Sequence, residues 1–301
     1  FETKLIFIYI LTFFSGMLIS LDISSRQSYL ATLVTRKKLK SGIALNIILV
    51  NSAWFIGPNI GMFFMDFLAL DKLYLCLGFV NALNLIILFR MPKLNITKSE
   101  KNKYSGFTNG INFAIKNKII FATLLIVAIG NLTAFTFESM TPYFARFIYN
   151  ATPEQFSLMI SLQGLGALLG SIIFFPLLIR INRPGLVFVV ATIMLCIGSI
   201  IFTLNDSFFS GCITLAILGG GTTFFMNMHS RILLTETPNP LRGRIQGLAQ
   251  FGIGFFPIGS LLVGILGDNI GILNSMRIFA CIGVISVILV LILFEDLKVK
   301  L

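Results

Sequence analysis

The sequence predicts an all-α fold, a polytopic bundle of membrane-spanning helices. Of its 301 residues 56% are hydrophobic and only 12% are charged, and the mean hydropathy is +0.93. The apolar residues gather in runs of about 20, which is the length of helix that crosses the hydrocarbon core of a bilayer. A soluble globular domain has a far more polar composition, so the chain is predicted to be a membrane protein.

Nine apolar runs are long enough to be membrane spans, and each is bounded by charged residues or by Pro, Gly or Asn. They lie near residues 5–22, 43–65, 73–90, 119–141, 155–179, 185–204, 208–229, 247–267 and 275–294.

The basic residues predict the orientation of these spans. Of the 23 Lys and Arg, 19 fall on one side, in the loops after the first, third, fifth and seventh runs and in the C-terminal tail. Cytoplasmic loops are enriched in Lys and Arg, so this side and the C-terminus are predicted to be cytoplasmic. With nine spans the N-terminus would lie outside, and a polytopic chain that begins there at Phe1 is expected to be a fragment.

The formal net charge of +11 does not indicate a nucleic-acid partner, because there is no polar domain to carry a basic patch. Cys76, Cys196, Cys212 and Cys281 stand singly in apolar runs, so neither a disulfide framework nor a zinc site is expected. His229 is the single histidine and acidic residues are few, which argues against an enzyme and against a metal or other cofactor.

Two cytoplasmic loops resemble each other at an offset of 205 residues. The matched pairs are Asp22 with Asn227, Ser25 with Ser230, Arg26 with Arg231, Lys37 with Arg242, Gly42 with Gly247 and Ala44 with Ala249. A parallel duplication of a helical half produces such a pattern, although any two basic loops beside a membrane also look alike.

The offset predicts twelve spans in two halves, three of them upstream of Phe1. Residues 1–90 would be the last three spans of the N-terminal half, residues 91–118 a cytoplasmic joint, and residues 119–301 the C-terminal six-helix half. In the joint, Phe107, Ile111, Ala114 and Ile115 recur at helical spacing beside lysines, which predicts an amphipathic helix on the cytoplasmic face.

Three segments resemble the major facilitator superfamily, and more narrowly its bacterial drug and siderophore exporters. They are DISSRQSYLATLVTRKKLKSGIALN (residues 22–46), GFTNGINFAIKNK (106–118) and PNPLRGRIQGL (238–248). The loop after Leu178 departs from the family because IRINRPG lacks the acidic residue, so no gating ion pair is assigned there. The resemblance implies a carrier that works by alternating access, commonly driven by protons, in the export direction.

Polar side chains at membrane depth are expensive unless they face the bundle interior, so they are candidates for the substrate and proton pathway. Glu138 and Asn131 lie seven residues apart, nearly two helical turns, and point the same way. Glu138 could carry a proton or pair with a cationic substrate. Counted at about 1.5 Å per residue from Lys118, it could instead lie near the outer interface and cap a helix end.

Further candidates for the pathway are Gln163, Asn227 and His229. Gln163 stands beside Gly164, Gly166 and Gly170, which are best explained as close-packing positions between helices. His229 follows Asn227 near a helix C-terminus, where a histidine more often satisfies the helix dipole than carries protons. Other asparagines, such as Asn46 and Asn51, are expected to join helices by hydrogen bonds.

The candidate cytoplasmic gate consists of Asp22, Arg26, Arg231, Arg242 and Arg244. Asp22 is predicted to pair with Arg26 one helical turn on. By resemblance, the two basic loops would hold the halves together in one state of the cycle, and anchoring to lipid headgroups is the competing explanation.

The sequence therefore predicts a multi-pass transporter of the cell inner membrane, a monomer surrounded by lipid, that exports amphipathic small molecules such as drugs or macrolides in exchange for protons. A dedicated siderophore exporter is the alternative within this class. A membrane assembly or sensor protein with the same fold and no flux is the alternative outside it.

Overall fold

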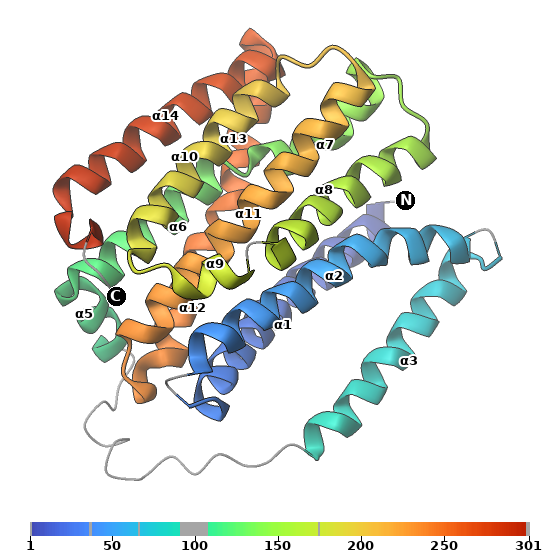
Figure 1. Cartoon of the computed structure of the whole chain (residues 1–301). Coiled ribbons are helices and arrows are strands. Elements are labelled where there is room, and N and C mark those ends of the chain that lie inside the picture. Colours follow the sequence, from blue (N-terminus) through green and yellow to red (C-terminus); the bar gives the residue numbers. More distant parts are fainter. Residues whose placement is uncertain (1, 36–37, 66, 91–107, 174, 299–301) are drawn as a thin grey trace.

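The computed structural model describes the chain except for residues 1, 36–37, 66, 91–107, 174 and 299–301. The described residues form helices and contain no strand, as the composition predicts (Figure 1). The main helices are α1 (Glu2–Leu33), α2 (Leu39–Met65), α3 (Leu70–Phe89), α5 (Thr108–Lys116), α6 (Lys118–Thr133), α7 (Thr136–Tyr143), α8 (Pro153–Ile173), α9 (Phe175–Arg180), α10 (Pro184–Phe202), α11 (Phe208–Glu236), α12 (Arg242–Ile253), α13 (Phe255–Ile270) and α14 (Ile272–Leu293).

Eight helical segments of the described chain are long and apolar enough to cross a membrane. They coincide with eight of the nine predicted runs. The remaining run, 73–90, is occupied by α3, a helix of 20 residues that follows α2, is exposed along most of its described length and stands apart from the rest of the bundle in Figure 1. The counts of nine and of twelve spans stay predictions.

The first predicted span is only the beginning of a longer helix. The run 5–22 ends at Asp22, but α1 continues to Leu33. A charged pair one turn apart supports a helix, so Asp22 and Arg26 mark a change from apolar to polar surroundings and not the end of the helix.

The core of the bundle lies in the C-terminal helices, α6 to α14. Large side chains such as Phe137, Phe188 and Phe225 are fully buried there. On the outside, apolar side chains such as Ile265 and Ile285 are exposed, as expected where lipid is the surrounding solvent. This surface agrees with a membrane protein and not with a soluble one.

Glycines bring α8 and α11 into close contact. A Cβ atom at Gly166 would collide with the carbonyl of Ala216, and one at Gly219 with the carbonyl of Gln163. A Cβ at Gly164 would lie 2.8 Å from Cα of Phe55 in α2. A Cβ at Gly170 would lie 3.1 Å from Cα of Gly220 in α11, so the predicted role of Gly164, Gly166 and Gly170 as close-packing positions is confirmed.

The amphipathic helix of the joint is present as α5. Its Ala114 is buried in a small core with Ile120, Leu233 and Ile245, so α5 is packed against the bundle as well as amphipathic. Phe107, which the sequence pattern assigns to the same helix, lies outside the described residues.

Candidate functional site

A cavity of about 330 Å³ lies between the N-terminal helices α1 and α2 and the C-terminal helices. Its polar lining comes from α1, α2, α6, α7, α8, α11 and α12 and consists of Arg26, Gln27, Asn46, Asn51, Asn131, Glu138, Gln163, Thr222, His229, Ser230 and Gln250. Binding sites for small molecules fall in the range of about 300–1,000 Å³ and place a few polar groups in an apolar wall. We call this space the central cavity.

A break in the helix directs Glu138 into the central cavity. The predicted span 119–141 is divided into α6 and α7. At the break, the N–H groups of Ala134 and Phe135 both donate to the carbonyl of Gly130 in the last turn of α6. Glu138 follows in the first turn of α7, and Gln163 Nε2 of α8 donates to Glu138 Oε1 at 3.1 Å.

Glu138 contacts the cavity wall and does not serve as a helix cap. Counting residues along one straight helix places Glu138 near the outer interface, where it would only cap a helix end. In the structure its side chain bonds Gln163 in the wall of the central cavity, and α7 has no side-chain cap. The prediction that Asn131 and Glu138 face the same side holds despite the break, since both line the cavity.

Asn131 and His229 are nearly buried and also line the central cavity. Asn131 Nδ2 donates to the carbonyl of Val127 at 2.8 Å. His229 Nδ1 lies 2.9 Å from the carbonyl of Phe225. A carbonyl can only accept, so this contact places the proton of a neutral His229 on Nδ1 and leaves Nε2 as an acceptor, 3.4 Å from Ser230 Oγ.

Asn227 lies apart from the other pathway candidates. Asn227 is buried between helices and is not part of the cavity wall. Its Nδ2 donates to the carbonyl of Thr223 one turn earlier at 3.0 Å. Two residues along a helix rotate a side chain by about 200°, so Asn227 and His229 cannot share a face, and only His229 faces the cavity.

The predicted gate residues lie in three different places. Arg26 lines the central cavity and forms the expected ion pair with Asp22, with Nη2 and Oδ2 3.4 Å apart. Arg242 joins the two sets of helices, since its Nη1 donates to the carbonyl of Ala31 in α1 at 2.8 Å and its Nε to that of Leu234 at 3.2 Å.

Arg231 and Arg244 have contacts with other C-terminal segments. Arg231 Nη2 donates to the carbonyl of Ile181 at 2.7 Å, which ties α11 to the turn after α9. Arg244 packs over α5, because a Cβ at Gly110 would lie 2.9 Å from Arg244 Cβ. Arg242 has the contact that a gate between the two sets of helices requires.

Asn51 confirms the expectation that asparagines join helices. Its Nδ2 lies 3.2 Å from the carbonyl of Ala167, 2.6 Å from Ser171 Oγ and 3.2 Å from Thr223 Oγ1, so one amide connects α2 to α8 and α11. Asn46, expected to have the same role, lines the central cavity.

Sequence reasoning missed Gln27, Trp54 and Gln250 in the cavity wall. Gln250 lies inside an apolar run, so the criterion that selected Gln163 would also have found it. Gln27 lies beyond the end of the predicted first span, and nothing in the sequence distinguishes Trp54 from a lipid-facing aromatic residue.

The electrostatics of the cavity set Glu138 apart. Its ionisable wall residues are Arg26, Glu138 and His229. Arg26 is paired with Asp22, whereas no ion pair to Glu138 is found in the described part of the chain. A carboxyl group whose neighbour is a neutral amide can gain and lose a proton without breaking an ion pair.

A helical membrane bundle with a polar cavity between two sets of helices is the arrangement expected of a membrane transporter. Residues 3–300 match the family described as transmembrane secretion effectors, MFS_3. The chain belongs to this family, and it is a transporter of the efflux type within the major facilitator superfamily.

Similar proteins agree with this assignment. The enterobactin exporter EntS of Salmonella typhi is 24% identical over 301 residues, which cover 99% of this chain and 72% of the exporter. In fold, the chain is similar to the human organic anion transporter MFSD10, with a TM-score of 0.68 at 13% identity over 89% of this chain and 67% of that one. The fucose:proton symporter FucP of E. coli has a TM-score of 0.64 at 12% identity over 92% and 73% of the two chains.

Proposed function

We propose that this protein exports amphipathic small molecules in exchange for protons, by alternating access of the central cavity to the two sides of the inner membrane. The observation that carries the proposal is Glu138, a carboxyl group without an ionic partner among the described residues, in the wall of a cavity between two sets of helices. Such a group can exchange a proton for a substrate that needs the same site.

The arrangement around the cavity supports alternating access. Arg242 and the apolar cluster of Ala31, Leu39, Ile43, Ile47 and Leu234 connect α1 and α2 to the C-terminal helices. These residues adjoin the basic loops, so in our proposal they close the cavity on the cytoplasmic side, where the C-terminus also lies. We further propose that the protein works as a monomer in lipid and catalyses no chemical reaction.

A dedicated siderophore exporter is the second candidate, and one feature of the cavity favours it. The wall carries six carboxamide side chains, namely Gln27, Asn46, Asn51, Asn131, Gln163 and Gln250. Amides both donate and accept hydrogen bonds, which suits a substrate rich in oxygen atoms better than a lipophilic cation. The relatives named as enterobactin exporters add to this alternative.

The test is uptake driven by a pH gradient into inside-out vesicles that carry the full-length protein, with the fluorescent lipophilic cation rhodamine 6G as the probe. We expect uptake that collapses when the gradient is dissipated. Inhibition by an excess of a catecholate siderophore, together with little uptake of the cation, would favour the second candidate.

Proton release from the purified protein separates a carrier from an assembly or sensor protein with this fold. A carrier that exchanges substrate for protons releases them when substrate binds, whereas a scaffold has no reason to couple the two events. Absence of both flux and proton release with either type of substrate would overturn the proposed function.

A further inference from the structure

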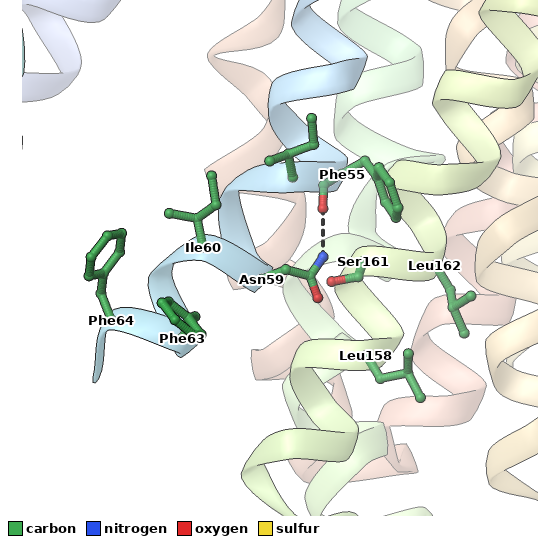
Figure 2. A pocket seen from close by; sticks show the side chains of 9 residues that line it. Phe55, Asn59, Ile60, Phe63, Phe64, Leu158, Ser161 and Leu162 are labelled. Carbon is green, nitrogen blue, oxygen red and sulfur yellow. Dashed lines mark hydrogen bonds between the residues drawn. The ribbon is translucent and has the colours of Figure 1, made fainter. Parts of the chain in front are cut away.

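A second hollow lies on the side of α2 and α8 away from the basic loops. It has a volume of about 560 Å³ and is lined by apolar side chains such as Ile60, Phe63 and Leu158, together with two polar residues, Asn59 and Ser161. Phe63 and Leu158 are exposed, so this hollow opens toward lipid. We call it the lateral groove (Figure 2).

Ser161 lacks the hydrogen bond that a helical serine usually makes. Elsewhere in α8, Ser171 Oγ donates to the carbonyl of Ala167 one turn earlier at 2.8 Å. Ser161 is only 3% exposed, and its Oγ has no hydrogen-bond partner. A buried hydroxyl without a partner costs about 1–3 kcal/mol, so Ser161 is in a position to bind something.

Asn59 adds a second unused polar atom to the same place. Its Nδ2 donates to the carbonyl of Phe55 at 2.8 Å, and its Oδ1 remains available. Figure 2 shows Asn59 of α2 and Ser161 of α8 directed toward each other across the groove. A molecule bound in the groove could form hydrogen bonds with Asn59 and Ser161 while its apolar part contacts the apolar side chains on either side.

The depth of Ser161 decides what chemistry the occupant has. Ser161 lies eight residues after Pro153, the first residue of α8, or about 12 Å along the helix. At that depth the acyl chains of a lipid offer only hydrocarbon, which cannot bond a hydroxyl. An amphipathic molecule with a carbonyl, amine or hydroxyl group beside its apolar body can.

The lateral groove is separated from the central cavity by a thin seam. Trp54 and Gln163 line the cavity, whereas their neighbours Phe55 and Leu162 line the groove. Between them Gly164 touches the backbone of Phe55. Because Gly164 has no side chain, the backbones of α2 and α8 come into contact at this point of the seam.

We propose that the lateral groove is a second binding site for the exported amphipathic substrate, in which the apolar body lies between α2 and α8 and a polar group bonds Ser161. The inference rests on the proposed function, since it concerns the same substrate. It extends that function by giving the substrate a lipid-facing site beside the central cavity.

The test is photo-crosslinking in membranes that contain the full-length protein. Benzoylphenylalanine replaces Leu158 in the groove or, as the matched control, Leu169, which is exposed on nearly the same face of α8 three turns further on. Rhodamine 6G is the probe, because it combines an apolar ring system with amine and ester groups. Mass spectrometry identifies each adduct.

We expect probe adducts at position 158 that exceed those at 169. The substitution Ser161→Ala should lower them about fivefold, the effect of losing one neutral hydrogen bond. Adducts at 158 that contain only phospholipid, equal yields at the two positions, or a yield that Ser161→Ala does not change would each overturn the inference. Efflux is measured in parallel, so that absent efflux contradicts the proposed function while the adducts still report on the groove.

Discussion

Replacing Glu138 by Gln should uncouple transport from the pH gradient. Among the described residues, Glu138 is the one carboxyl group that lines the central cavity, so a cycle that uses it moves one proton. A gradient of one pH unit is then worth about 1.4 kcal/mol, which supports about a tenfold concentration ratio of a substrate exchanged for one proton. Without the carboxyl group the ratio should fall to about one.

The substitution is mild for the structure. Gln is close to Glu in size, and its side-chain oxygen can still accept from Gln163 Nε2, which lies 3.1 Å from Glu138 Oε1. The variant exchanges a hydrogen bond to a charged acceptor for a neutral one, a difference of about 1 kcal/mol. Equal expression and an unchanged melting temperature are therefore expected, so a loss of accumulation reports on coupling.

The assay measures the steady-state accumulation of rhodamine 6G in inside-out vesicles at a fixed gradient of one pH unit. Glu154→Gln is the matched control, because Glu154 lies in the first turn of α8 and outside the cavity wall. The control should keep the tenfold ratio. A Glu138→Gln protein that also keeps it would refute the assignment of the coupling proton to Glu138 and shift attention to His229.

Three further predictions concern other parts of the structure. His229→Gln should keep the tenfold accumulation, measured in the same vesicles, because His229 is already engaged with a backbone carbonyl; loss of coupling would make it a proton carrier. Arg242→Gln should open the cytoplasmic side, since it weakens two hydrogen bonds from a charged group, each worth about 1.5–3 kcal/mol, and faster labelling of a cysteine placed in the cavity would show it. Gly166→Ala should destabilise the protein by about 1–3 kcal/mol through its collision with Ala216, whereas Gly247→Ala, with open space around it, should not; equal melting temperatures for the two would contradict the packing argument.

The membrane fold could be predicted because hydrocarbon imposes one simple requirement. Every backbone polar group must be satisfied within a span, so long apolar runs become helices whatever their detailed sequence. The same requirement does not determine how far a helix continues outside the lipid. The extension of α1 beyond Asp22 to Leu33 could therefore not be predicted from the apolar run. Apolar runs also carry no signal for the break at Ala134 and Phe135, which contains neither Pro nor Gly.

The candidate site could be predicted only in part. The free-energy cost of a polar side chain in the membrane shows which residues need a polar environment, but not which way each side chain points. Glu138, Asn131, Gln163 and His229 are expensive at membrane depth, and all four line the cavity. Asn227 is equally expensive, yet it is buried between helices and is not part of the cavity wall. The choice between these outcomes depends on the rotation of each helix against its neighbours, which a single sequence does not contain.

The contacts between the two sets of helices differ in kind, and the difference indicates where movement is cheapest. At the seam, glycine packing and the Asn51 amide hold α2 to α8 and α11, and an amide within 3.2 Å of three acceptors can keep one while the helices rotate. At the end beside the basic loops, Arg242 and a cluster of five buried apolar residues join α1 and α2 to the C-terminal helices, and these contacts break together when the two sets of helices separate. Separating them costs a few kcal/mol, which is comparable to the binding of a substrate and a proton. We therefore expect the seam to act as the pivot and the contacts of Arg242 to act as the gate, so that protonation of Glu138, which bonds Gln163 beside the seam, can shift the balance between the two states.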